Sequence, residues 1–349
     1  MNNTFNIKNL VRENVRKINP YSSARDEYQS TGNTMIFLDA NENPFETDVN
    51  RYPDPQQRSL KKELATIKGV DPNNILLGNG SDEVLDLLFR AFCEPGKDNV
   101  ITLPPTYGMY KVLAGINNVE NREVLLTSVF EPNVKEILER VDAKTKMIFL
   151  CSPNNPTGNS FSDENVLEIL NNFSGLVIID EAYIDFSDRE SWIKKLDNFP
   201  NLVITQTLSK AYGLAGIRLG ICYASAEIIT ILNKIKPPYN VNELTQQRAL
   251  NRLRDEQVVQ SEVSGILKER AILLKSLLEV KYIEKVYATD ANFVLVKVDD
   301  AGKRYNQLLD KGIVIRNRTK EPLCENTLRI TIGTAKENKE LLEALQNLD

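Results

Sequence analysis

The chain of 349 residues contains no histidine, and this absence removes several classes of chemistry. Without histidine there is no Ser-His-Asp or Cys-His nucleophile, no histidine-ligated metal and no phosphohistidine relay. The four cysteines are scattered with no CxxC pair, so we expect neither a metal site nor a disulfide framework. Any catalysis must therefore use Lys, Asp, Tyr, Arg, Asn and Ser, or a bound cofactor.

Long apolar runs and a strong net charge are also missing. No run approaches the ~20 residues that span a bilayer, and residues 1–16 lack the apolar segment of a signal peptide, so we expect a cytoplasmic protein. Lys and Arg total 43 against 48 Asp and Glu, a net charge of −5, which argues against nucleic acid or a membrane as partner. The length predicts roughly two domains.

Strand and helix patterns alternate along much of the chain. Short apolar stretches predict strands at 35–38, 75–77, 100–103, 146–151, 176–180 and 202–206. The last three recur at about the 30-residue length of a βαβ unit. The stretch 176–179 is apolar throughout, as in strands that are covered on both faces. These patterns predict an α/β domain.

The alternation stops near Pro237-Pro238. Residues 241–279 form a long helical pattern, which we expect to break near Gly265. Two strand candidates, 293–298 and 328–332, and a final helix at 338–348 follow. We therefore predict an N-terminal arm (1–28) packed on the small domain or a partner subunit, a large α/β domain (29–240) and a smaller α+β domain (241–349).

Polar clusters follow three consecutive strands of the predicted large domain, at 152–158, 180–183 and 207–210. Ligands of open α/β sheets bind outside the carboxyl ends of the strands, so one pocket could collect all three clusters. The turn 78–81 at a helix start would aim free N–H groups at a phosphate. It matches neither a P-loop nor GxGxxG, so it gives little support to nucleotide binding.

Taken singly, these residues have ordinary structural explanations. Asp180 at a strand end is usually a cap or turn residue, and a lone Lys210 is usually a solvated charge. Asp180 and Glu181 are adjacent and point to opposite faces of a strand. They therefore do not form the carboxylate pair of a glycoside hydrolase.

In combination, the motifs resemble the fold-type I pyridoxal-phosphate aminotransferases of the aspartate aminotransferase superfamily. The matching order is Asn155-Pro156-Thr157-Gly158, then Asp180-Glu181-Ala182-Tyr183, then Thr207-Leu208-Ser209-Lys210, then Arg218. Further stretches, at 19–21, 38–44, 51–53, 80–83, 104–110 and 328–330, are similar to the histidinol-phosphate aminotransferase family. The resemblance covers nearly the whole chain. It implies a large domain with a mostly parallel seven-stranded sheet sandwiched by helices, and a smaller α+β C-terminal domain.

The resemblance also implies how the chain would use pyridoxal 5'-phosphate. Lys210 would attach the cofactor covalently and then carry a proton as general base and acid. Asp180 would pair with the ring nitrogen, Tyr183 and Asn155 would donate to the ring's phenolate oxygen, and Tyr107 would stack on the ring. The phosphate would be held by the backbone of Ser81 and Asp82, the hydroxyls of Thr207 and Ser209, and the guanidinium of Arg218.

Two further sets of contacts are implied by the resemblance. Tyr52 would reach the cofactor phosphate from the neighbouring subunit, which implies a homodimer with shared active sites. The substrate would be bound by Arg329 at its anionic end, with Tyr21, Asn43 and Arg316 assisting. Arg316 could equally belong to a solvated basic turn.

The implied reaction is amino transfer from L-histidinol phosphate to 2-oxoglutarate in histidine biosynthesis, giving imidazole-acetol phosphate and L-glutamate. Two alternatives use the same machinery: an aromatic amino-acid aminotransferase, and a pyridoxal-phosphate-dependent threonine-phosphate decarboxylase. An enzyme without histidine suits a cell that is short of histidine, which tilts the choice slightly toward the first.

Overall fold

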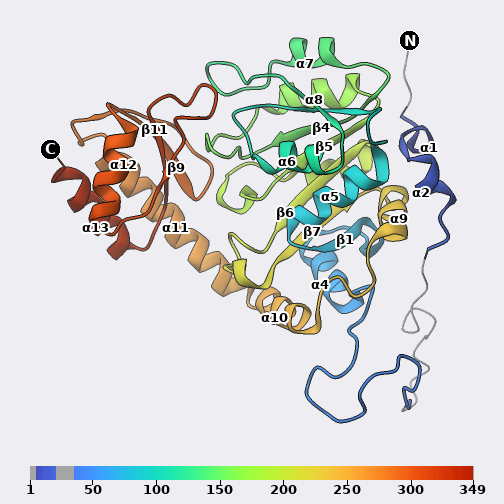
Figure 1. Ribbon diagram of the computed structural model, residues 1–349. Coiled ribbons are helices and arrows are strands. Elements are labelled where there is room, and N and C mark those ends of the chain that lie inside the picture. The colour runs from blue at the N-terminus through green and yellow to red at the C-terminus, as the bar shows by residue number, and fades with distance from the viewer. Residues whose placement is uncertain (1–4, 21–34, 349) are drawn as a thin grey trace.

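A seven-stranded sheet organises the larger part of the molecule (Figure 1). The computed structural model describes residues 5–20 and 35–348. The strands, in order across this sheet, are β1 (Ile75–Asn79), β7 (Leu219–Ala224), β6 (Leu202–Thr207), β5 (Leu176–Asp180), β4 (Thr145–Cys151), β2 (Asn99–Thr102) and β3 (Glu120–Glu123). β7 is antiparallel to both of its neighbours, and all other neighbouring pairs are parallel. The mostly parallel seven-stranded sheet is therefore confirmed.

Alternate residues of the central strands face two separate helical layers. In β4, Ile148 and Leu150 face one layer, whereas Met147 and Phe149 face the other. The first layer includes α4 (Arg58–Lys68), α8 (Asp163–Asn172) and α10 (Glu243–Arg254). α7 (Val134–Arg140) lies next to α8. The second includes α5 (Ser81–Phe92), α6 (Met109–Ile116) and α9 (Ala226–Ile235).

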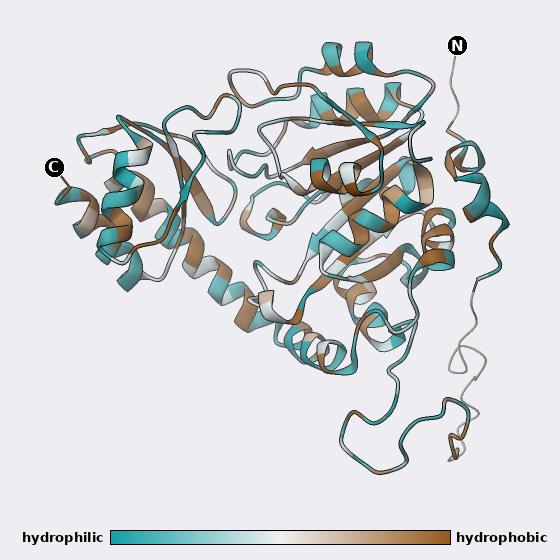
Figure 2. Ribbon diagram, viewed as in Figure 1, coloured by the Kyte–Doolittle hydropathy of each residue, from teal (hydrophilic) through white to brown (hydrophobic). Residues whose placement is uncertain are grey.

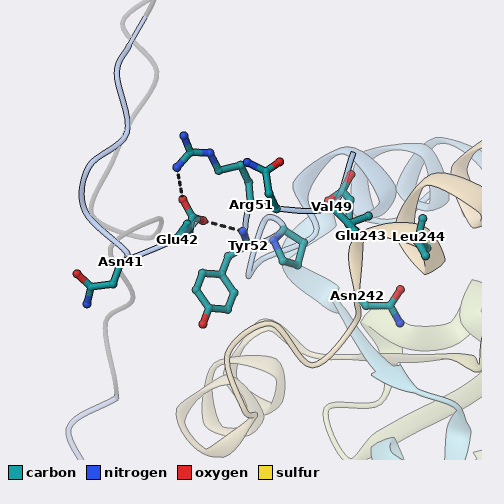
Figure 3. Close-up of a pocket in the computed structure, with 10 residues that line it drawn as sticks. Asn41, Glu42, Val49, Arg51, Tyr52, Asn242, Glu243 and Leu244 are labelled. Atoms are coloured by element: carbon teal, nitrogen blue, oxygen red, sulfur yellow. Dashed lines mark hydrogen bonds and ion pairs between the residues drawn. The ribbon is translucent and has the colours of Figure 1, made fainter. Parts of the chain in front are cut away.

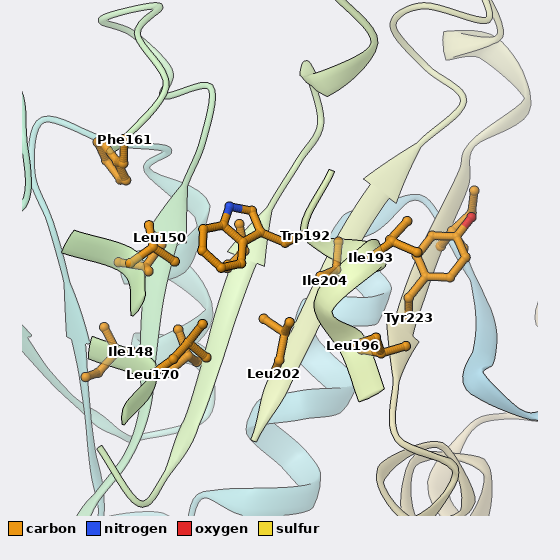
Figure 4. Close-up of a cluster of buried hydrophobic side chains, with 14 of the residues drawn as sticks. Ile148, Leu150, Phe161, Leu170, Trp192, Ile193, Leu196, Leu202, Ile204 and Tyr223 are labelled. Atoms are coloured by element: carbon orange, nitrogen blue, oxygen red, sulfur yellow. The ribbon is translucent and has the colours of Figure 1, made fainter. Parts of the chain in front are cut away.

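Burial on both faces explains why the central strands are apolar throughout. Figure 2 shows these strands in brown between helices of mixed colour. Figure 4 shows the first face, where Leu202 and Ile204 of β6 lie close to Trp192 and Leu196.

A second, four-stranded sheet forms the core of the C-terminal part. Its order is β10 (Arg316–Asn317), β11 (Thr327–Thr331), β9 (Phe293–Val298) and β8 (Ile283–Val286), all antiparallel. Its apolar face packs with α11 (Glu256–Leu277), α12 (Ala301–Asp310) and α13 (Ala335–Gln346). Thr334 and Glu337 form a capping box at the start of α13. In Figure 1, α11 runs from the large sheet to this second sheet.

The helical segment after Pro237-Pro238 breaks at a different place from the one we expected. α10 ends at Arg254 and α11 begins at Glu256, whereas Gly265 lies inside α11. A glycine within an exposed helix lowers stability by only about 1 kcal/mol, which a 22-residue helix can absorb. The division at 240/241 stays an interpretation, and Ala249 and Leu253 of α10 pack in the core of the large sheet.

The prediction of a strand at 35–38 was wrong. No strand forms there, and Ile36 and Leu38 are 84% and 88% exposed. The described part of the arm contains α1 (Ile7–Leu10) and α2 (Glu13–Lys17), and it lies against α5 and α9. The backbone N–H of Arg12 donates to the carbonyl of Ala91 at 3.0 Å. Within residues 5–20 and 35–348, no helix is long and apolar enough to cross a membrane.

Candidate active site

One pocket opens at the carboxyl ends of the large sheet's strands, where the predicted cofactor residues meet. Its lining residues are Ser81, Asp82, Tyr107, Cys151, Asn155, Asp180, Ala182, Tyr183, Thr207, Ser209, Lys210 and Arg218. They lie at or after the ends of β1, β2, β4, β5 and β6, and in the turn before β7. The structure therefore brings together every predicted cofactor residue except Tyr52.

The start of α5 forms one side of the pocket and could hold an anion. Its N-cap, Gly80, has φ 78° and no side chain caps the helix. First-turn N–H groups that no side chain caps attract anions, and the helix dipole adds to this. Gly220 on β7 allows the turn to lie against the sheet, because a Cβ there would come within 2.2 Å of the Ser81 nitrogen.

Cationic and hydroxyl groups line the same side of the pocket. Arg218 has φ 56° after the short turn η4 (Ala215–Ile217), and its Nη2 lies 3.5 Å from Oδ2 of Asp82. The hydroxyl of Thr207 lies 3.0 Å from that of Ser209 and accepts a hydrogen bond from the Ser209 N–H at 3.1 Å. Backbone N–H groups, hydroxyls and a guanidinium thus converge as donors.

Lys210 lies in the turn directly after β6. It is solvent-accessible, yet the surrounding protein partly desolvates its ammonium. This desolvation lowers the pKa of Lys210 below its ordinary value, and the positive charge of Arg329 lowers it further. A lowered pKa raises the fraction of neutral amine, which is the form that acts as nucleophile and base.

Asp180 ends β5 and is only 3% exposed. Its Oδ2 accepts a hydrogen bond from the Tyr110 hydroxyl at 2.7 Å, and its Oδ1 accepts one from the Ala182 N–H at 3.2 Å. Burial raises the pKa of Asp180, while these hydrogen bonds oppose that rise. No basic side chain in the described part of the chain forms an ion pair with it.

Aromatic and amide groups also line the pocket. The Tyr107 hydroxyl donates to Oδ1 of Asp82 at 3.0 Å. Tyr183 is 7% exposed, and burial raises the pKa of its phenol. The Tyr183 ring meets that of Phe293 edge-on, with centroids 5.1 Å apart. Asn155 is 8% exposed, so these groups are held in place by surrounding protein.

Arg329 on β11 does not itself line the pocket but contacts Asn155, which does. Its Nη1 donates to Oδ1 of Asn155 at 2.5 Å, and its guanidinium lies 5.2 Å from the centroid of the Phe293 ring. Burial, and then the charge of Arg318, lower the pKa of Arg329 to about 10. Arg316 is directly opposite on β10 and is exposed.

Tyr52 and Asn43 do not line this pocket. Tyr52 is 51% exposed, and its ring stacks on Tyr239 with centroids 4.5 Å apart. Figure 3 shows it beside Arg51 and Glu42: Glu42 pairs with the Arg51 guanidinium and accepts a hydrogen bond from the Tyr52 N–H, both at 2.7 Å. Asn43 is exposed on the same segment. Tyr21 falls outside the described residues.

Sequence analysis missed two contributors to the site. Tyr110 holds Asp180, and Phe293 packs against both Tyr183 and Arg329. Tyr110 stands within the quoted stretch 104–110, but nothing local distinguishes it from an ordinary core aromatic. Phe293 begins β9 in the other domain, so only the fold brings it to the site.

Comparisons with known proteins show the family of the chain. Residues 36–345 match the family model described as aminotransferase class I and II. A histidinol-phosphate aminotransferase of Flavobacterium johnsoniae is 68% identical over 348 residues, which cover 99% of this chain and 100% of that protein. The chain belongs to the histidinol-phosphate aminotransferase family. The expected family is therefore confirmed.

Solved structures of histidinol-phosphate aminotransferases share the fold. The crystal structure from Clostridium acetobutylicum has a TM-score of 0.80 and 26% identity, covering 86% of this chain and 90% of that one. The structure from Sinorhizobium meliloti, in complex with pyridoxal-5'-phosphate, has a TM-score of 0.78 and 25% identity, covering 86% and 83%. The expected fold class is thus confirmed by both the sheet topology and these likenesses.

Proposed function

We propose that the chain transfers the amino group of L-histidinol phosphate to 2-oxoglutarate with pyridoxal 5'-phosphate as cofactor. The products are imidazole-acetol phosphate and L-glutamate. The observation that carries the proposal is one pocket that joins Lys210, Asp180 and Arg218 at the start of α5, in a chain of this family.

The pocket's residues fit this cofactor by their chemistry. Asp180 is a buried carboxylate with no ion-pair partner in the described chain, and a protonated ring nitrogen would balance its charge. The N–H groups at the start of α5, which no side chain caps, and the guanidinium of Arg218 can both donate hydrogen bonds to a phosphate. When bound, the cofactor supplies an electron sink for the carbon that bears the amino group.

The chain's own residues would bind, orient and move protons. We assign to Lys210 the covalent attachment and then the transfer of a proton to and from the amine-bearing carbon, for which its lowered pKa prepares it. Tyr107 would cover the ring face, while Tyr183 and Asn155 would donate hydrogen bonds to the ring oxygen. The buried positions of Tyr183 and Asn155 would keep bulk water away from that oxygen.

Arg329 is the proposed partner of the substrate's anionic end. A guanidinium matches a phosphate or a carboxylate through two parallel hydrogen bonds, so it can serve histidinol phosphate and glutamate in turn. Burial and the nearby charge of Arg318 disfavour its cationic form, and the negative charge of a bound anion would offset both effects. We assign Arg316 on the neighbouring strand, with Tyr21 and Asn43, a supporting role.

We also propose a homodimer in which Tyr52 of each chain enters the partner's pocket. Tyr52 does not line the pocket of its own chain. It belongs to the segment between residues 35 and 57, which extends from the body at the bottom of Figure 1. This segment exposes Ile36, Leu38 and Phe45, which a second copy would cover. A cytoplasmic location stays a prediction.

Absorbance spectra of the purified, cofactor-loaded protein test the substrate. The account expects rapid conversion of the cofactor to its amine form with histidinol phosphate, and much slower conversion with phenylalanine. Threonine phosphate should release no carbon dioxide. Faster conversion by phenylalanine would favour an aromatic aminotransferase, and carbon dioxide release would favour a decarboxylase.

A further inference from the structure

Tyr110 lies behind the carboxylate that the proposed function places at the cofactor's ring nitrogen. It stands in the first turn of α6 and is fully buried. Its hydroxyl donates to Oδ2 of Asp180 at 2.7 Å, while the Ala182 N–H donates to Oδ1 at 3.2 Å. Among the groups that hydrogen-bond this carboxyl, the Tyr110 hydroxyl has the largest effect on its pKa, and a side-chain substitution can remove it.

The Tyr110 ring is fixed before any ligand binds. It stacks on Phe149 with centroids 4.9 Å apart and 19° between the planes. It also meets Tyr107 edge-on, with centroids 5.6 Å apart. Packing on two sides determines where the hydroxyl points, so the carboxylate orientation is set without loss of side-chain freedom on binding.

The hydrogen bond also favours the charged form of Asp180. Burial raises the pKa of this carboxyl, and the Tyr110 hydroxyl is the largest influence that opposes the rise. Burial raises the pKa of Tyr110 itself well above its ordinary value, so it stays a donor. The other titratable groups that line the pocket are Asp82, Tyr107, Cys151, Tyr183, Lys210 and Arg218.

We propose that Tyr110 is a positioning residue whose hydroxyl keeps Asp180 ionised and aimed at the ring nitrogen of the cofactor. Where Asp180 and the ring nitrogen share one proton, a donor to the carboxylate favours the proton on the nitrogen. The inference rests on the proposed function for the cofactor. The hydrogen bond itself can be tested in protein without cofactor.

The experiment compares Tyr110→Phe with Tyr223→Phe. Tyr223 is also fully buried, but its hydroxyl has no hydrogen-bond partner in the described structure, so its removal controls for the loss of a buried hydroxyl. Carbon-13 NMR of the cofactor-free proteins measures the carboxyl pKa of Asp180, with Asp180→Asn to assign its resonance. Binding titrations measure the affinity for pyridoxal phosphate, and nitrogen-15 NMR of labelled cofactor reports the proton on its ring.

Tyr110→Phe should raise the Asp180 pKa and weaken cofactor binding by about tenfold to a hundredfold, the range for a hydrogen bond to a charged group. It should also shift the ring nitrogen toward its unprotonated signal. Tyr223→Phe should leave all three measurements unchanged. An unaltered Asp180 pKa in Tyr110→Phe overturns the inference.

A double-mutant cycle separates positioning from packing. In the Asp180→Asn background, Tyr110→Phe should change cofactor affinity by no more than about twofold, because the charge on which it acts is gone. An equal loss in both backgrounds would show that Tyr110 only fills the core. If the unaltered protein bound no pyridoxal phosphate, the proposed function would fail, while the Asp180 pKa would still decide the role of Tyr110.

Discussion

Replacing Arg329 with alanine should weaken both substrates of the proposed reaction. The guanidinium is half-buried, donates to Asn155 and lies against Phe293, at the junction of the two domains. Without it, the substrate's anionic end would lie unpaired in a partly desolvated pocket. Truncating one partner of such a charge pair costs about 2–5 kcal/mol. At 1.36 kcal/mol per factor of ten, this is roughly a 30-fold to 5,000-fold loss in kcat/KM.

Two further variants calibrate this loss. Arg329→Lys should recover only part of it, because a point charge does not reproduce the two parallel hydrogen bonds of the guanidinium. Arg316→Ala is the matched control, since Arg316 lies directly opposite on β10 but is exposed. Solvent screening limits an exposed charge to about 1 kcal/mol, so its loss should stay near fivefold.

The assay measures kcat/KM for each half-reaction separately, with circular dichroism to verify folding. The reasoning requires losses with both histidinol phosphate and glutamate. A loss confined to glutamate would show that other residues hold the phosphate, with Arg316 and Tyr21 the first to test. A larger loss in Arg316→Ala than in Arg329→Ala would refute the assignment outright.

Three other predictions concern the cofactor and the subunits. Lys210→Ala should still bind cofactor but lose about 10²–10⁴-fold or more in turnover. In the unaltered protein, the rate at which cofactor attaches covalently should rise with pH and level off below pH 10.5, because the pKa of Lys210 is lowered from that value. Gly220→Ala should force the turn at Ser81 outward, lowering stability in urea by about 1–3 kcal/mol and weakening cofactor binding. Gly216→Ala has open space and should change neither. Mixing Tyr52→Phe chains with Lys210→Ala chains should restore activity in hybrid dimers, and a monomer by sedimentation would contradict this.

The strands of the large sheet differ in how clearly the sequence pattern predicts them. The sequence of β5 is Leu-Val-Ile-Ile-Asp, and its apolar run reflects burial on both faces. This continuous apolar run allowed the strand to be predicted. β3 contains no apolar residue, so pattern analysis could not find it, and it forms an edge strand through its pairing with β2. β7 begins directly after Arg218, and the sequence pattern did not distinguish this strand from the turn that contains Arg218.

Strand ends in the sequence predicted which polar clusters would share one pocket, whereas the role of each residue came from the family resemblance. Asp180 and Lys210 were expected to meet because strand ends of a parallel sheet lie at one edge, and both line the same pocket. Tyr110 could not be found, since its ring occupies a core position of a helix and its partner lies 70 residues away in the chain. The role of Arg329 came from the family resemblance, and its contact with Asn155 depends on how the two domains meet.

Borohydride reduction followed by peptide mapping tests the central assignment most directly. Reduction makes the bond between lysine and pyridoxal phosphate permanent, so the label records which lysine bears the cofactor. The account predicts one label per chain, on Lys210 in the peptide that follows β6. A label on any other lysine, or no label in protein that carries out the transamination, would contradict the placement of the active site in this pocket.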